Sequence, residues 1–89
     1  GASADKDYQA MVRRLLPVAD LAIFTRADNP RAVAPAELLR CAGGRGVAVG
    51  SVARALALAR KVAGPDDAIV ITGSFYVAGE ALGLLGRRT

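Results

Sequence analysis

The strongest local signal for chemistry is the tripeptide Thr72-Gly73-Ser74, which follows a short apolar run and precedes a helical pattern. Glycine allows a tight turn, and a serine that opens a helix leaves free backbone N–H groups beside two hydroxyls. Carboxylates and phosphates bind at such helix starts, because the helix dipole and the N–H groups favour negative charge. A plain helix cap explains the same residues. Spacing alone therefore leaves an anion site and a cap as two open interpretations.

Charged residues at two further places are candidates for the same chemistry. Lys6 could contact a phosphate or a carboxylate, and Asp5 could order a ribose or a cation; a capped, solvated helix start explains both equally well. Arg26 and Arg31 flank the polar turn at 28–30. These arginines could bind an anion, or they could fix the loop through its carboxylate, and the residues alone leave both interpretations open.

Composition excludes several classes of site. The chain contains no histidine and one cysteine, Cys41, so a histidine base, a Ser-His triad, a His-ligated metal and a disulfide framework are all excluded within it. The lone cysteine favours a reducing, cytoplasmic location. The net charge of +4 is dispersed, and only two Phe and two Tyr are present for base stacking, which argues against nucleic-acid binding. The apolar stretch at 68–86 is interrupted by polar residues and is interpreted as a strand and a helix, not a membrane span.

Hydrophobic periodicity predicts the elements that position these residues. Helices are expected at 7–16, from Pro35 to the glycine pair at 43–44, at 52–63 and from Ser74 onward, and strands at 20–25, 46–50 and 68–72. Alternation at this spacing predicts an α/β fold, an open and mainly parallel sheet with right-handed crossovers. With 89 residues the chain is one domain without an internal boundary. A chain of this architecture that begins with a helix is expected to lack its first strand.

Two helices have apolar faces that can be stated residue by residue. The first helix has its apolar face at positions i, i+3, i+4, i+7 and i+8, and either Ser3 or Asp5 is expected to cap this helix. The last is expected to bury a face of small and aliphatic residues. These faces consist of Tyr8, Met11, Val12, Leu15 and Leu16, and of Ala78, Ala81, Leu82 and Leu85.

Several segments, in order, resemble the C-terminal domain of the folylpolyglutamate synthase/dihydrofolate synthase family. The stretch Ile69-Val-Ile-Thr-Gly-Ser-Phe-Tyr-Val-Ala-Gly-Glu80 resembles the C-terminal signature of that family and is preceded by Gly64-Pro-Asp-Asp67. Ala4-Asp-Lys-Asp7 resembles the start of the same domain, and Thr25-Arg-Ala-Asp-Asn-Pro-Arg-Ala32 resembles the segment between them. The resemblance covers nearly the whole chain.

The family belongs with the Mur ligases, and the resemblance implies a Rossmann-like domain of an ATP-dependent amide ligase. In such enzymes ATP phosphorylates a carboxylate, and L-glutamate attacks the acyl phosphate of dihydropteroate or of the γ-carboxylate of a folate. The resemblance places Thr72, Gly73, Ser74 and Tyr76 at the substrate. It places Asp5 and Lys6 at the nucleotide or acyl-phosphate cleft, and it favours a role for Arg31 in shaping the loop over a role in the chemistry.

The resemblance also implies what this chain does not contain. In the family a separate P-loop domain binds ATP and most of the magnesium, and a hinge precedes the C-terminal domain; neither is present in these residues. We therefore expect no catalytic residue, no metal site and no ligase activity in the chain alone. If the missing strand lies in the middle of the sheet, the chain has exposed strand edges, which predicts self-association or marginal stability as a monomer. Two other interpretations stay open: a non-catalytic module that binds an anionic metabolite or a partner protein, and a Mur-type ligase for another amino acid.

Overall fold

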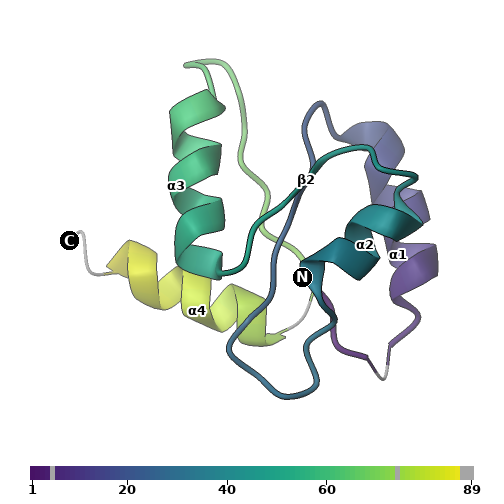
Figure 1. Cartoon of the computed structure of the whole chain (residues 1–89). Helices are drawn as coiled ribbons and strands as arrows, with labels where there is room; N and C mark the ends of the chain where they lie inside the picture. The colour runs from purple at the N-terminus through teal and green to yellow at the C-terminus, as the bar shows by residue number, and fades with distance from the viewer. Residues whose placement is uncertain (5, 74, 87–89) are drawn as a thin grey trace.

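The computed structural model describes residues 1–4, 6–73 and 75–86, and in the last helix the side chains of 78, 79 and 81–84. Helices alternate with very short strands, and the two strands pair in parallel, which confirms the α/β class (Figure 1). The elements are α1 (Tyr8–Leu15), η1 (Leu16–Val18), β1 (Ile23–Phe24), α2 (Pro35–Cys41), β2 (Val47–Ala48), α3 (Val52–Val62) and α4 (Phe75–Gly86).

The helices begin and end where local signals placed them. Pro35 opens α2, where its missing N–H costs no hydrogen bond. Gly43 and Gly44 end α2 with φ of 65° and 81°, a backbone region that favours glycine. Ser51 caps α3, and its hydroxyl oxygen accepts a hydrogen bond from the Arg54 N–H at 3.2 Å. The predicted cap of α1 was wrong: Asp7 accepts the hydrogen bond, from the Ala10 N–H at 3.2 Å.

The strands are shorter than predicted, and one of them does not form. The pairs Ile23–Val47 and Phe24–Ala48 make the whole described sheet. Residues 68–72 form no strand in the described structure, contrary to the prediction. A strand needs partners for its backbone groups, and within the described residues this segment pairs with no strand; the Gly1 amino group donates to the Thr72 carbonyl oxygen at its end.

Two small cores hold the helices. The first lies between α1, α2 and the N-terminal segment, and the second lies where α3, α4 and the loop after β1 meet. Figure 1 shows α3 and α4 on one side of the strands and α1 and α2 on the other. The buried members are Ala2, Val12, Val33, Leu38 and Ala42 in the first core, and Ala27, Val52 and Ala81 in the second.

The buried face of α4 differs from the prediction at one position. Ala81 is buried as expected, but Leu82 is 69% exposed, and Leu84 packs against the second core instead. The helix is apolar on nearly every side, so periodicity could not select the side that contacts α3. Leu85 lies outside the described side chains.

Candidate functional site

The N-terminal segment is fastened to the loop that follows β1. The Val33 N–H donates to the Ala2 carbonyl at 2.9 Å, and the Ala4 N–H donates to the Arg31 carbonyl at 2.7 Å. Ser3 forms an isolated antiparallel bridge with Ala32. These contacts bring the residues directly before Lys6 beside Arg31, although they are far apart in sequence.

The Thr72–Gly73 turn lies against the same N-terminal segment. The Gly1 ammonium donates a hydrogen bond to the Thr72 carbonyl oxygen at 3.3 Å. Gly73 has a φ of 120°, and a Cβ at this position would overlap the backbone carbonyl of Gly1. Glycine is therefore required at 73 both by its backbone conformation and by the close passage of the two chain segments.

The loop after β1 is shaped by its own side chains. The Asn29 carboxamide oxygen accepts from the Arg31 N–H at 2.9 Å, which is a turn typical of asparagine. Arg26 donates from Nη2 to the Asn29 carbonyl at 3.4 Å. Thr25, at the end of β1, is only 5% exposed, and its hydroxyl has no hydrogen-bond partner among the residues described. A buried, unpaired hydroxyl is costly and indicates that a polar partner belongs next to it.

The predicted site residues are thus brought together in part. Lys6 is exposed, and its N–H donates to the Ser3 carbonyl at 3.1 Å, so the lysine follows directly on the segment that contacts Thr72 and Arg31. Asp5 and Ser74 lie outside the described residues. Tyr76 lies in the first turn of α4, and its side chain is also outside the described part.

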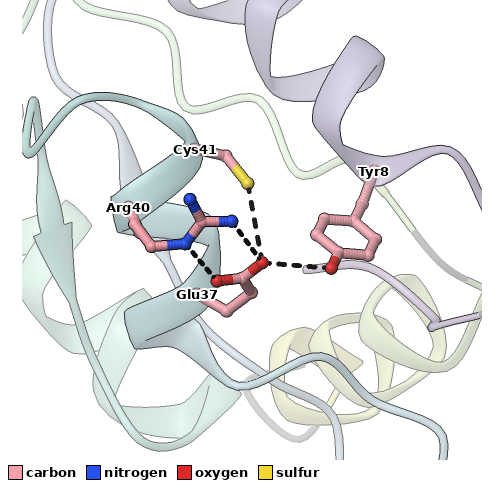
Figure 2. A network of polar contacts seen from close by, with 4 residues as sticks. All are labelled: Tyr8, Glu37, Arg40 and Cys41. Atoms are coloured by element: carbon pink, nitrogen blue, oxygen red, sulfur yellow. Dashed lines mark hydrogen bonds and ion pairs between the residues drawn. The ribbon is translucent and has the colours of Figure 1, made fainter.

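Sequence reasoning missed a polar cluster between α1 and α2 (Figure 2). Glu37 accepts from Arg40 through both carboxylate oxygens, at 2.6 Å from Nε and 2.8 Å from Nη2. The Tyr8 hydroxyl donates to the Glu37 Oε2 at 3.1 Å, and the Cys41 Sγ lies 4.0 Å from that oxygen. The spacings 37–40 and 37–41 are helical neighbours and could have been noticed, but the contact from Tyr8 is not visible in the sequence.

The charges of this cluster favour its ionised form. Hydrogen bonds from Arg40 are the largest cause that lowers the pKa of Glu37 to about 2, and burial acts in the opposite direction. The hydrogen bond to Glu37 raises the pKa of Tyr8. The Tyr8 hydrogen bond joins α1 to α2, whereas the Arg40 and Cys41 contacts lie within α2. Both carboxylate oxygens have partners, which is consistent with a structural role for the cluster.

Two further searches concern the described residues alone. No three His, Cys, Asp or Glu side chains gather among them as a metal site. Within the same residues, no helix is both long and apolar enough to cross a bilayer.

Comparisons with known proteins identify the family. Residues 1–75 match the family model described as Mur ligase, glutamate ligase domain. The chain is also 43% identical over 86 residues to a probable bifunctional folylpolyglutamate synthase/dihydropteroate synthase of Haloferax volcanii (strain ATCC 29605 / DSM 3757). This match covers 91% of the chain and 10% of the relative. The relative's name gives dihydropteroate synthase as the second activity, whereas the resemblance described above is to dihydrofolate synthase. No solved structure matches significantly. The chain belongs to the Mur ligase family, in which it matches the glutamate ligase domain.

Proposed function

We propose that the chain acts as the C-terminal, closing domain of a cytoplasmic ATP-dependent ligase that adds L-glutamate to a folate-type acceptor. The acceptor is dihydropteroate or the γ-carboxylate of a folate, and the reaction passes through an acyl phosphate. The family match and the name of the relative support this proposal. The chain spans a tenth of that relative, so the remaining parts of the reaction fall to other domains.

One observation carries the proposal: Gly1 contacts Thr72 and Gly73, while Ala4 contacts Arg31. The segment that leads to Lys6 therefore shares one edge of the fold with the turn that opens α4. A cation and a helix start on one edge form a surface suited to anionic groups, such as a phosphate and a carboxylate.

The proposed roles follow from this edge. Thr72, Gly73, Ser74 and Tyr76 hold the glutamate or the folate tail, and the described backbone places the first two of these beside the N-terminal segment. Lys6, with Asp5, approaches the nucleotide. Arg31 shapes the loop, since its backbone N–H and carbonyl join Asn29 and Ala4.

Lys6 is suited to the phosphate groups of ATP, but the described residues include no cluster of side chains that could hold magnesium. Lys6 is an exposed cation, which suits a phosphate. When bound, ATP supplies the phosphoryl group that activates the acceptor carboxylate. We assign the P-loop and the magnesium ligands to a separate domain, and the chain alone is expected to bind weakly and not to turn over.

The test is a chimera in which this chain replaces the segment it matches in the Haloferax volcanii relative. We expect ATP- and glutamate-dependent ligation by the chimera. Lys6→Met is expected to lower kcat/KM on the order of a hundredfold, as for loss of one charge-stabilising donor. Lys61→Met is the matched control, because Lys61 is an exposed lysine in the last turn of α3 and is expected to have no effect.

Two results would contradict the proposal. A folded chimera that ligates another amino acid in preference to glutamate would indicate a different Mur-type substrate. A folded chimera with no ligase activity, together with anion binding by the isolated chain, would favour a non-catalytic binding module.

A further inference from the structure

Lys6 lies between two connections that join the N-terminal part of the chain to the β1 loop and α2. The first is the short antiparallel contact of residues 2–4 with residues 31–33, made by two backbone hydrogen bonds. The second is the hydrogen bond that the Tyr8 hydroxyl donates to the Glu37 carboxylate at 3.1 Å. The turn that carries Lys6 is therefore fastened to the rest of the fold on both sides.

The backbone of Lys6 is itself hydrogen-bonded in both directions. Its N–H donates to the Ser3 carbonyl at 3.1 Å, and its carbonyl accepts from the Tyr8 N–H at 2.8 Å. Asp7, the next residue, caps α1 by accepting from the Ala10 N–H at 3.2 Å. The place from which the exposed lysine extends therefore depends on where α1 begins, and so on what holds Tyr8.

Glu37 is a well-fixed acceptor for Tyr8, because Arg40 orients its carboxylate (Figure 2). Arg40 donates to both carboxylate oxygens, a bidentate geometry that allows little rotation. The pKa of Glu37, lowered to about 2, keeps the carboxylate charged at neutral pH, and a charged acceptor strengthens the bond from Tyr8. The Tyr8 ring also packs against the first core, so removing the hydroxyl alone leaves this packing in place.

We propose that Tyr8 and Glu37 are positioning residues for Lys6: their hydrogen bond fixes the start of α1 and thereby the place of the lysine ammonium. The inference rests on the proposed function, in which Lys6 approaches the nucleotide. Apolar packing of α1 on α2 is non-directional and leaves the helix free to slide or rotate slightly, whereas a hydrogen bond between oriented groups does not. Both residues act through Lys6, and neither contacts the nucleotide.

A role in stability alone is the alternative, and Val12→Ala is the matched comparison for it. Val12 lies one turn after Tyr8 on the same face of α1 and is 4% exposed in the same core. Its truncation weakens the packing between the helices but keeps the hydrogen bond between Tyr8 and Glu37.

The first measurement needs no ligase activity. Amide nitrogen relaxation gives the backbone order parameter of Lys6 in the 89-residue chain, in the wild type, Tyr8→Phe and Val12→Ala. We expect a rigid value of about 0.85 in the wild type and in Val12→Ala, and a value below about 0.6 in Tyr8→Phe. An unchanged value in folded Tyr8→Phe would overturn the inference.

The second measurement is a double-mutant cycle in the Haloferax volcanii chimera. Lys6→Met and Tyr8→Phe are made singly and together, and kcat/KM for ATP is measured. We expect Tyr8→Phe to lower kcat/KM roughly tenfold, as for a misplaced binding group, and to have no further effect once Lys6→Met is present. Val12→Ala should leave kcat/KM unchanged in both backgrounds, at a temperature where the chimera is folded.

Two substitutions of Glu37 extend the cycle. Glu37→Ala removes the acceptor and should behave like Tyr8→Phe. Glu37→Gln keeps an amide oxygen that can accept from the Tyr8 hydroxyl, so it should lower kcat/KM less than Glu37→Ala does. Equal losses in the two variants would contradict a role through the hydrogen bond to Tyr8.

The remaining outcomes separate this inference from the proposed function. If Tyr8→Phe lowers kcat/KM by the same factor with and without Lys6→Met, its effect does not pass through the lysine; the inference is then wrong, and the ligase proposal stands. A loss in Val12→Ala as large as in Tyr8→Phe would likewise assign the cluster to stability alone. If Lys6→Met has no effect in an active chimera, the proposed role of Lys6 is wrong, and the inference falls with it.

Discussion

Gly73→Ala is the substitution that tests most directly whether the N-terminal segment and the turn before α4 are built as one unit. Gly73 has a φ of 120°, a region that side chains rarely adopt, and an added Cβ would overlap the Gly1 carbonyl. The alanine must therefore change its own backbone or displace Gly1. Either response separates the two segments that form the proposed site edge.

The expected cost combines two contributions. Forcing alanine into a left-handed backbone costs roughly 1–2 kcal/mol. Separating Gly1 from Thr72 loses a hydrogen bond worth about 0.5–1.5 kcal/mol. The free energy of unfolding should fall by about 1.5–3.5 kcal/mol, out of about 5–15 kcal/mol for a typical small domain. In a domain of this length that corresponds to a decrease of roughly 6–28 °C in Tm.

Two other glycines separate these contributions. Gly44 has a φ of 81° but open space around its Cβ position. Gly44→Ala should therefore lower the free energy of unfolding only by the cost of the left-handed backbone, roughly 1–2 kcal/mol. Gly79 lies within α4 with open space and ordinary helical backbone, so Gly79→Ala should stabilise by about 0.5–1 kcal/mol.

Urea unfolding followed by circular dichroism measures all three variants, and hydrogen exchange of the Ala4 and Val33 amides reports on the N-terminal segment. These two amides donate to Arg31 and Ala2 and should exchange faster in Gly73→Ala alone. If Gly73→Ala lowers the free energy of unfolding no more than Gly44→Ala does and leaves the exchange of these amides unchanged, the contact between Gly1 and Gly73 does not contribute to stability.

The remaining predictions concern the cores, a cap and the polar cluster. Leu38→Ala should lower the free energy of unfolding by about 2–5 kcal/mol in urea, because Leu38 is 1% exposed, whereas Leu82→Ala at a 69% exposed position should change it by less than about 0.5 kcal/mol. Ser51→Ala should cost about 0.5–2 kcal/mol and reduce the helical circular dichroism signal. The lowered pKa of Glu37, about 2 against an ordinary 4.5, makes its contribution complete above pH 4.5 and lost as the pH falls through 2. Glu37→Gln should therefore destabilise at neutral pH, with a difference from the wild type that shrinks between pH 4.5 and 2. Tyr8→Phe removes one of the hydrogen bonds that lower the pKa of Glu37, so it should lower the urea midpoint and leave a smaller pH dependence. A pH-independent difference for Glu37→Gln would exclude the ionised carboxylate as its cause.

The helices were predictable because their boundaries are local. Pro35 and Ser51 act through the first turns of their own helices, and the glycine pair at 43–44 ends α2 through its own backbone angles. The cap of α1 was missed because three candidate residues lie within five positions, and only the geometry of the turn selects Asp7.

The strands and the polar cluster were less predictable because they depend on distant partners. The run at 68–72 has a sequence typical of strands, but its ladder depends on what lies beside it, and in the described structure that is a cavity. The contact between Tyr8 and Glu37 likewise joins residues 29 positions apart. The meeting of the N-terminal segment with the turn at 72–73 also joins residues far apart in the sequence.

The position of Gly1 links the fold to the proposed site. Gly1 contacts the Thr72–Gly73 turn on one side, and the next residues hold the Arg31 loop through Ala2 and Ala4. A change that displaces Gly1 therefore acts on both the turn before α4 and the Arg31 loop. It follows that Gly73→Ala should affect the Arg31 loop through Ala2 and Ala4, although the overlap that it creates is with Gly1.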